Sequence, residues 1–297
     1  MISRDLATFA EVSGGVLQGA NAKFARVSSD SRALEPGALF VALTGDRFDG
    51  HDFVAAAAKL GAAGAIVSRP VDCALPQVVV ADTLAGLATF ANAWRRSFAG
   101  VVVGITGSNG KTTVKEMTGA ILAELGPCLV TQGNLNNHIG VPLTLCRLEA
   151  THRCAVIEMG ANHLREIAHL AAIAEPTVGL VINAGQAHLE GFGGIEGVAR
   201  GKGEMFEALG PDGTAVINVD DRFAAFWQDR ARRAGRVVTF GLRERADVSA
   251  RDVRSHLGSA GFVTTFELVT TFGARSIELG LAGEHNVMNA LAATAAA

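Results

Sequence analysis

The chain has 297 residues, of which 49% are hydrophobic, and a formal net charge of −3. This length is sufficient for two domains, and the composition excludes an intrinsically disordered chain. The charge balance shows no polybasic region, so neither a nucleic acid nor a membrane surface is the expected partner.

The first residues lack the long apolar core of a signal peptide, and no stretch is apolar over the length of a bilayer. The cysteines are scattered without a Cys-x-x-C spacing, which is typical of reduced structural thiols. They are Cys73, Cys128, Cys146 and Cys154. We therefore expect a cytoplasmic monomer.

Residues 1–98 alternate short apolar runs with helical stretches, which predicts a small α/β domain. Asp52 is expected to cap a helix that runs through Leu60. Ser31 and Arg32 belong to a run of small hydroxyl residues that precedes a glycine-rich loop ending at His51. These groups suit a polar anionic ligand, although ordinary turn chemistry would produce a similar pattern.

Residues 101–113 read Val-Val-Val-Gly-Ile-Thr-Gly-Ser-Asn-Gly-Lys-Thr-Thr, an apolar strand followed by a glycine turn and a helix start. Such a turn directs backbone N–H groups at a phosphate, while Lys111 neutralises phosphate oxygens and Thr112 binds Mg²⁺. The strict motif has glycine five residues before Gly110, where this chain has Ile105. A turn that only joins strand to helix would not require Lys and Thr, so we predict an ATP or GTP site.

The second predicted domain, residues 99–297, continues as apolar strands separated by helices, which favours a mostly parallel sheet covered on both faces. Residues 247–281 alternate apolar and polar side chains, as antiparallel strands do. A final helix begins at about Asn286 and runs to Ala297 without a stop signal. The fold class is therefore α/β, with a phosphate-loop domain that we expect to be truncated.

Candidate metal ligands follow the predicted strands. Glu158 ends an apolar strand, where its carboxylate can complete the Mg²⁺ shell begun by Thr112. The alternative is that its negative charge only interacts favourably with the dipole at the N-terminus of the next helix. His188 follows the strand at 178–183 and is either a ligand or a hydrogen-bonded structural group. An asparagine-rich loop at 131–140 suits sugar, peptide or phosphate recognition, although asparagine and glycine also form turns.

Lys202 lies on the apolar face of the helix predicted at 196–209, with Val198 and Met205 above and below it. Burying an ammonium beside a magnesium site is unfavourable. We expect Lys202 to be paired with a carboxylate, neutralised or chemically converted. The alternative is a lysine whose stem lies on the apolar face and whose ammonium reaches solvent.

Taken together, these motifs resemble the Mur ligases, the ATP-dependent amide-forming enzymes of peptidoglycan precursor synthesis. Thr-Gly-Ser-Asn-Gly-Lys-Thr-Thr at 106–113 is similar to the family's ATP loop, and Ser-Asp-Ser-Arg with the Phe-Asp-Gly-His segment is similar to its UDP-binding domain. Gly-Asn-Leu-Asn-Asn-His-Ile-Gly-Val-Pro and Ala-His-Leu-Glu-Gly-Phe-Gly are most similar to one branch. That branch joins D-Ala-D-Ala to UDP-N-acetylmuramoyl-tripeptide.

The resemblance implies roles for individual residues, grouped here by ligand. ATP would be bound by Gly107, Ser108, Asn109, Gly110, Lys111, Thr112, Thr113, His285 and Asn289, the last nearest to adenine. The two Mg²⁺ ions would be held by Thr112, Glu158, His188 and Lys202, with Lys202 carrying a CO₂-derived carbamate. The UDP-linked substrate would be bound by Ser31, Arg32, Asn134 and Asn137. Lys111, His188 and Lys202 are the expected catalytic residues.

The implied reaction passes through an acyl phosphate, which D-Ala-D-Ala then attacks. Members of the family carry a third, C-terminal domain that nothing in this sequence matches, so we expect a fragment that is inactive alone. The alternatives are a sister ligase that adds the third amino acid to the UDP-muramoyl dipeptide, and a module that binds substrate without turnover. Folylpolyglutamate synthase fits less well, because it lacks the Ser-Asp-Ser-Arg domain. A regulatory GTPase is disfavoured, because the sequence contains no Asn-Lys-x-Asp signature.

Overall fold

The computed structural model describes residues 1–46, 48–258 and 261–297; Arg47, in the predicted glycine-rich loop of the first domain, lies outside them. The chain forms two compact units. The first contains residues 1–99 and 138–150, and the second contains 100–137 and 151–297. Residues 138–150, which we expected in the second domain, therefore belong to the first unit.

The first unit is built on a five-stranded sheet in the order β1-β7-β6-β3-β2, parallel except for β1. A separate hairpin is formed by β4 and β5. The strands are β1 (Val16–Gln18), β2 (Val27–Ser28), β3 (Leu39–Val41), β4 (Thr44–Gly45), β5 (Phe48–Asp49), β6 (Gly64–Val67) and β7 (Gln77–Val79). The helices are α1 (Leu6–Ser13), α2 (Val54–Lys59), α3 (Thr83–Arg96) and α5 (Gly140–Leu145), with 3₁₀ turns η1 (Ser31–Ala33) and η2 (Gly50–Phe53).

The predicted cap of α2 is wrong. Asp52 lies inside η2, the 3₁₀ turn that precedes the helix, and Phe53 at the helix N-cap makes no side-chain cap bond. Asp49 instead accepts a hydrogen bond from the backbone N–H of His51 at 3.0 Å. The capped element thus begins three residues earlier than the apolar periodicity indicated, because a 3₁₀ turn extends the helix towards its N-terminus.

Arg4 anchors the returning segment 138–150 within the first unit. Its guanidinium donates to the carbonyls of Cys146 and Leu148 at 2.8 and 2.7 Å, and to that of Ala25 at 2.9 Å. The same guanidinium lies 4.5 Å from the ring centre of Trp94, whose indole N–H donates to Leu148 at 3.0 Å. These bonds satisfy carbonyls at the end of α5, which explains why the segment packs here.

The second unit is built on a nine-stranded sheet in the order β16-β15-β14-β13-β12-β11-β8-β10-β9. Its strands are β8 (Val101–Thr106), β9 (Cys128–Val130), β10 (Cys154–Glu158), β11 (Val178–Val181), β12 (Thr214–Asn218), β13 (Arg236–Phe240), β14 (Val248–Gly258), β15 (Gly261–Thr270) and β16 (Gly273–Leu279). Its helices are α4 (Lys111–Ala123), α6 (Glu166–Ala174), α7 (Leu189–Phe192), α8 (Ile195–Glu207), α9 (Ala224–Arg230) and α10 (Glu284–Ala296), with the 3₁₀ turn η3 (Ala231–Arg233).

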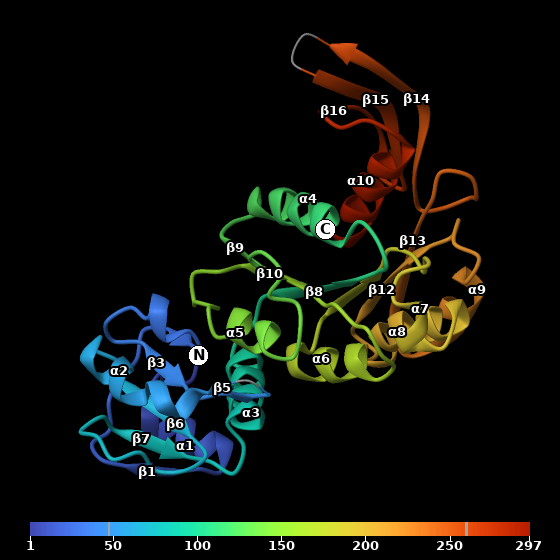
Figure 1. Cartoon of the computed structure of the whole chain (residues 1–297). Helices are drawn as coiled ribbons and strands as arrows, with labels where there is room; N and C mark the ends of the chain where they lie inside the picture. Colours follow the sequence, from blue (N-terminus) through green and yellow to red (C-terminus); the bar gives the residue numbers. More distant parts are fainter. Residues whose placement is uncertain (47, 259–260) are drawn as a thin grey trace. The chain divides into compact units, whose positions relative to one another are not determined.

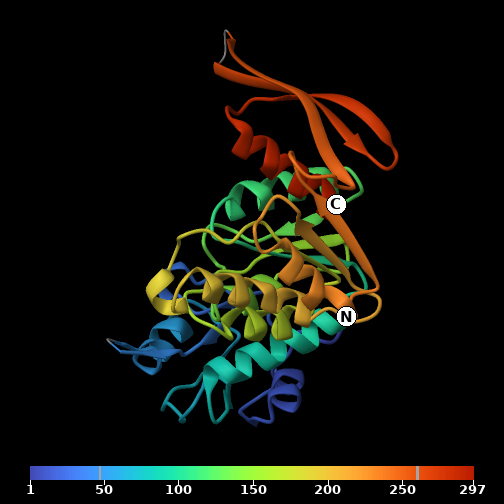
Figure 2. The same cartoon turned by 90° about the vertical axis from the view of Figure 1, so that its right-hand side faces the viewer.

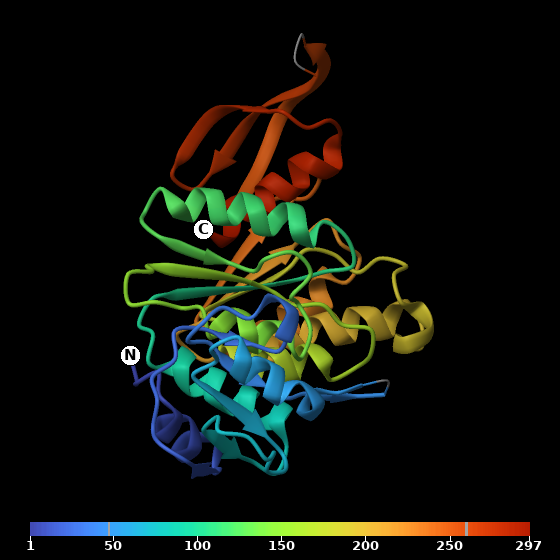
Figure 3. The same cartoon turned by 60° about the vertical axis from the view of Figure 1, so that its left-hand side comes forward.

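Helices cover both faces of the parallel part of this sheet, which confirms the predicted fold class. Helices α4 and α10 lie on one face, and α6, α8 and α9 lie on the other (Figures 1 and 2). The strands β14, β15 and β16 pair antiparallel, as predicted, and run past α10 (Figure 3). Val114 of α4 and Leu291 of α10 are fully buried against the sheet in one hydrophobic core.

The central strand β8 pairs in parallel with β10 on one side and β11 on the other. The three strands therefore end at the same edge of the sheet, at Thr106, Glu158 and Val181, and the loops that follow them converge there. All four cysteines are free thiols, as predicted. Among the described residues, no helix is both long and apolar enough to cross a bilayer.

Replacing Arg4 tests whether it anchors the segment 138–150. Arg4→Met removes charged donors from three carbonyls but keeps an apolar stem beside Trp94. We expect the free energy of unfolding to fall by about 2 kcal/mol, because two of those carbonyls are partly buried. Urea unfolding measures the change, with Arg26→Met as the control, since the ion pair of Arg26 with Glu35 is exposed to solvent. Equal losses in both variants would contradict the anchoring role.

Candidate functional site

The loop between β8 and α4 has the geometry of an anion site. Gly110 stands at the N-cap of α4 with φ +82° and provides no side chain to cap the helix. The N–H groups of the first turn, and the positive end of the helix dipole, are therefore left for an external acceptor. This is the backbone geometry that a phosphate loop at 107–113 requires, and the binding of a phosphate there stays a prediction.

Asn183, which follows β11, holds the first part of this loop. Its side-chain oxygen accepts from the N–H groups of Ser108 and Asn109 at 3.1 and 3.0 Å, and its amide donates to the Asn109 carbonyl at 3.2 Å. The Ser108 hydroxyl accepts from the N–H of Gly185 at 2.8 Å. Two loop N–H groups are thus used internally, while among the described residues no side chain caps the N–H groups of the first turn of α4, which could donate to a phosphate.

Lys111 folds back over the loop. Its ammonium donates to the carbonyl of Gly107 at 2.9 Å and lies 3.5 Å from that of Ser108. Burial lowers the pKa of Lys111 below its usual value, while the negative charge of Glu158 opposes this shift. The ammonium therefore rests on weak acceptors at the position where a phosphate would provide a stronger one.

Helix α10 packs against the same loop. A Cβ atom added to Gly110 would lie 2.5 Å from the side-chain oxygen of Asn289, which is buried. Asn289 donates to Asn286 at 3.3 Å, and Asn286 in turn lies 3.1 Å from the exposed ring of His285. The structure thus places Asn289 directly against the phosphate loop, with His285 one turn before it and exposed.

Glu158 joins the phosphate loop to the asparagine loop. Its carboxylate accepts from the Thr112 hydroxyl at 3.3 Å and from the Asn136 amide at 2.7 Å, and only 2% of the residue is exposed. The Glu158 backbone N–H donates to the Thr131 hydroxyl at 3.0 Å. The predicted pair of Thr112 and Glu158 is therefore in contact, and its role in metal binding stays a prediction.

Lys115 and Asn136 complete this cluster and were missed in the sequence. Lys115 is fully buried, and its ammonium lies 3.7 Å from the Glu158 carboxylate. The available signal for placing Lys115 near the site was its position three residues after Thr112, on the same side of α4. Asn136 was one of several asparagines in its loop, and nothing local distinguished it from Asn134 and Asn137, which are both exposed.

Lys202 is buried, as its helical position predicts, with 2% of the residue exposed. Its ammonium donates to the carbonyl of Ala161 at 3.3 Å and lies 5.3 Å from the ring centre of Phe192. Among the described residues no salt bridge joins it to a carboxylate, although the charges of Glu166 and Glu204 partly oppose the lowering of its pKa. Burial, followed by repulsion from Lys111, lowers the pKa of Lys202 to about 8.

His188 is exposed at the N-terminus of α7, with φ 59°. Within residues 1–46, 48–258 and 261–297, its ring makes no hydrogen bond or ion pair, and no group of three His, Cys, Asp or Glu side chains is spaced to hold a metal. The predicted metal set of Thr112, Glu158, His188 and Lys202 is therefore only partly assembled.

In the first unit, Arg32 is held by Asp30 rather than left open. The guanidinium donates to both carboxylate oxygens at 2.9 and 2.8 Å, and the Arg32 backbone N–H donates to the same carboxylate at 2.9 Å. These bonds lower the pKa of Asp30 to about 2. Ser31 begins the short 3₁₀ turn that Asp30 caps, so Ser31 and Arg32 are presented together on the surface.

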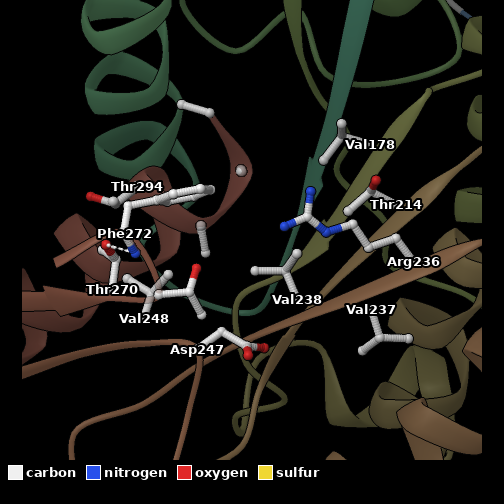
Figure 4. A pocket seen from close by; sticks show the side chains of 14 residues that line it. Val178, Thr214, Arg236, Val237, Val238, Asp247, Val248, Thr270, Phe272 and Thr294 are labelled. Atoms are coloured by element: carbon white, nitrogen blue, oxygen red, sulfur yellow. Dashed lines mark hydrogen bonds between the residues drawn. The ribbon is translucent and has the colours of Figure 1, made fainter.

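A separate cavity of about 380 Å³ lies at the opposite edge of the nine-stranded sheet, where β11, β12 and β13 begin (Figure 4). Arg236 and Asp247 lie on its wall among apolar side chains. Asp247 already accepts from the Thr239 hydroxyl and N–H at 2.7 and 2.8 Å. None of the predicted site residues is among the residues that line this cavity.

Comparisons with known proteins identify relatives of the chain. The family model of the Mur ligase middle domain matches residues 105–297, and the model of the Mur ligase family catalytic domain matches residues 23–95. The UDP-N-acetylmuramoyl-tripeptide–D-alanyl-D-alanine ligase of Escherichia coli is 46% identical over 99% of the chain, and the Haemophilus influenzae enzyme of the same name is 41% identical over 93%. The chain spans 64% and 60% of their lengths.

Solved structures of proteins named MurF are similar to this chain in both fold and sequence. A crystal structure of MurF from Acinetobacter baumannii has a TM-score of 0.89 and 40% identity, covering 97% of this chain and 63% of its own. MurF ligase from Thermotoga maritima in complex with ADP has a TM-score of 0.76 and 31% identity, covering 90% of this chain and 61% of its own.

The close approach of Asn289 to Gly110 predicts a coupled pair. In Gly110→Ala, the alanine must adopt a backbone φ of +82°, which is strained for a residue with a side chain. Its new Cβ atom would also lie 2.5 Å from the side-chain oxygen of Asn289. We expect a loss of unfolding free energy of about 2 to 4 kcal/mol from both effects. Urea unfolding of Gly110→Ala, Asn289→Ala and the double variant measures the coupling.

The matched control is Gly37→Ala, which has φ +79° and open space around the added atom. It should lose only the part due to backbone strain, about 1 to 2 kcal/mol. The pairing would be refuted by a Gly110→Ala variant no less stable than Gly37→Ala, or by no relief from Asn289→Ala.

Proposed function

This chain belongs to the Mur ligase family, and we propose that it serves the ATP-dependent ligation of D-Ala-D-Ala to UDP-N-acetylmuramoyl-tripeptide. The observation that carries the proposal is the uncapped, glycine-preceded N-terminus of α4 beside the buried Glu158 carboxylate, in a chain 46% identical to a ligase of that name. The sister reaction, which adds the third amino acid, is less well supported. A solved 2,6-diaminopimelate ligase shares the fold at 22% identity and a TM-score of 0.60.

ATP would lie along the phosphate loop, against the Lys111 ammonium and the N-terminus of α4. Residues 107–113 would bind its phosphates, with the Lys111 ammonium moving from the Gly107 carbonyl to a phosphate oxygen. The position of Asn289 over Gly110 supports its assignment to the nucleotide, where it would contact adenine with His285 as its neighbour. Backbone donors held by Asn183 would keep this cradle rigid before the nucleotide enters.

The oxygen atoms of Thr112 and Glu158 fit a magnesium ion, because Mg²⁺ prefers a few protein oxygens together with phosphates. When bound, Mg²⁺ would neutralise phosphate charge and polarise the transferred group. Asn136, by its bond to the second Glu158 oxygen, would keep the carboxylate turned towards Thr112.

A second cation site would need chemical change at Lys202, because an ammonium has no lone pair to donate. A neutral Lys202 amine can attack the carbon of CO₂, forming an N–C bond and releasing a proton, so that a buried cation becomes an anion. The low pKa of Lys202, and the hydrogen bond of its buried ammonium to the Ala161 carbonyl, support this conversion. His188 would supply an imidazole to the same site from its exposed position.

In the proposed reaction, a carboxylate oxygen of the tripeptide attacks the γ-phosphorus of ATP. A P–O bond forms, the bond to ADP breaks, and the product is an acyl phosphate. The amine of D-Ala-D-Ala then attacks the acyl carbon, phosphate leaves, and the amine loses a proton. Lys111 would offset the charge on the transferred phosphoryl group, while Asn134, Asn137, Ser31 and Arg32 would bind the UDP-linked substrate.

Calorimetric titration tests the substrate. The chain is titrated with UDP-N-acetylmuramoyl-tripeptide, with the dipeptide form and UDP-glucose as controls. We expect the tripeptide to bind about tenfold more tightly than the dipeptide, since its additional residue carries the reacting carboxylate. Tighter binding of the dipeptide would support the sister ligase, and no binding of either form would refute the proposal for this chain. An ADP titration in parallel tests the nucleotide site separately.

The Lys202 carbamate is tested by ¹³C NMR with labelled bicarbonate at constant dissolved CO₂. Because carbamate formation requires the neutral amine and the Lys202 pKa is about 8, occupancy should rise between about pH 7 and pH 9. A lysine with the usual pKa would react little in that range. The signal should disappear in Lys202→Ala and persist in Lys59→Ala, an exposed lysine of α2. A signal unaffected by Lys202→Ala would contradict the proposal.

A further inference from the structure

Lys115 is a fully buried lysine of α4 that faces the Glu158 carboxylate. Its ammonium lies 3.1 Å from Glu116, 3.7 Å from Glu158 and 3.5 Å from the carbonyl of Gly133. The Glu116 side chain is exposed, so solvent screens that ion pair. Glu158 is the buried partner, and a buried carboxylate without a counter-charge is strongly unfavourable.

The Glu158 carboxylate therefore has two classes of neighbour. Thr112 and Asn136 donate neutral hydrogen bonds to it, and Lys115 supplies a full positive charge. A divalent cation on Glu158 would stand close to this ammonium, and their repulsion is large in a buried, weakly screened site. Lys111 and the N-terminus of α4 add further positive charge on the same side.

We propose that Lys115 is the internal counter-ion of Glu158 and opposes divalent cation binding until a nucleotide supplies compensating negative charge. The inference rests on the proposed metal role of Glu158. Without nucleotide, the ammonium satisfies the carboxylate and keeps the cation affinity low. With nucleotide, the phosphate charges outweigh the positive groups around the loop, and the cation binds as part of the nucleotide complex. Lys115 acts through Glu158 and is a positioning residue, since its burial keeps it from the substrate.

This role predicts a gain of binding on mutation, which a space-filling or purely stabilising lysine would not give. In Lys115→Met the volume is nearly kept, but Glu158 is left as an unpaired buried charge that a cation can satisfy. The variant should be less stable than the wild type without metal, and a cation should restore more of its stability. The Mn²⁺ ion is the probe, because it takes oxygen ligands and is detected directly by electron paramagnetic resonance.

The experiment measures Mn²⁺ binding and the Mn²⁺-induced shift of melting temperature in the absence of nucleotide. We expect Lys115→Met to bind Mn²⁺ about tenfold or more tightly than the wild type, and Lys115→Arg to bind as weakly as the wild type. Lys59→Met, which removes the same charge from an exposed position, should match the wild type. The gain should vanish in Lys115→Met combined with Glu158→Gln.

The inference is overturned if folded Lys115→Met binds Mn²⁺ no more tightly than Lys59→Met. Lys115→Gln provides a second variant if the first fails to fold. The wild type gives an independent check, because Mn²⁺ binding that is equally tight with and without ADP would also overturn the inference. Failure of the wild type to bind ADP with Mn²⁺ at all would instead refute the proposed nucleotide function.

Discussion

The buried carboxylate of Glu158 is the interaction on which the rest of the site depends. It ends β10, accepts from Thr112 in α4 and from Asn136 in the asparagine loop, and faces the ammonium of Lys115. One side chain thus ties the phosphate loop to the loop that follows β9. Because the carboxylate is nearly inaccessible to solvent, each of these contacts is stronger than it would be on the surface.

The order of strands explains why this carboxylate lies where it does. β8 is central, with β10 on one side and β11 on the other, so loops far apart in the sequence meet at one edge. Asn183, in the loop that follows β11, binds the phosphate loop from the side opposite to Glu158. The loop is therefore held by residues that end or follow the two strands on either side of β8 before any ligand is bound, which reduces the reorganisation that nucleotide binding would require.

Much of the fold followed from local patterns. The strand, glycine turn and helix at 101–113 were predicted because each step has its own local signal, and the burial of Lys202 followed from helical periodicity. The cap at Asp52 was wrong because a 3₁₀ turn and an α-helix share the same polar start. The return of 138–150 to the first unit had no local signal, since it depends on bonds from Arg4 and Trp94.

The sequence by itself determined the fold class, the strand, glycine turn and helix at 101–113, and the family, because these depend on residue type and spacing within short segments. Only the tertiary structure decided which side chains meet: that Asn136 rather than its neighbours binds Glu158, and that Lys115 is its buried counter-charge. The physical reason is that side chains from different strands are brought together by the pairing order of the sheet. That order is set by packing over the whole unit and is not written in any one segment.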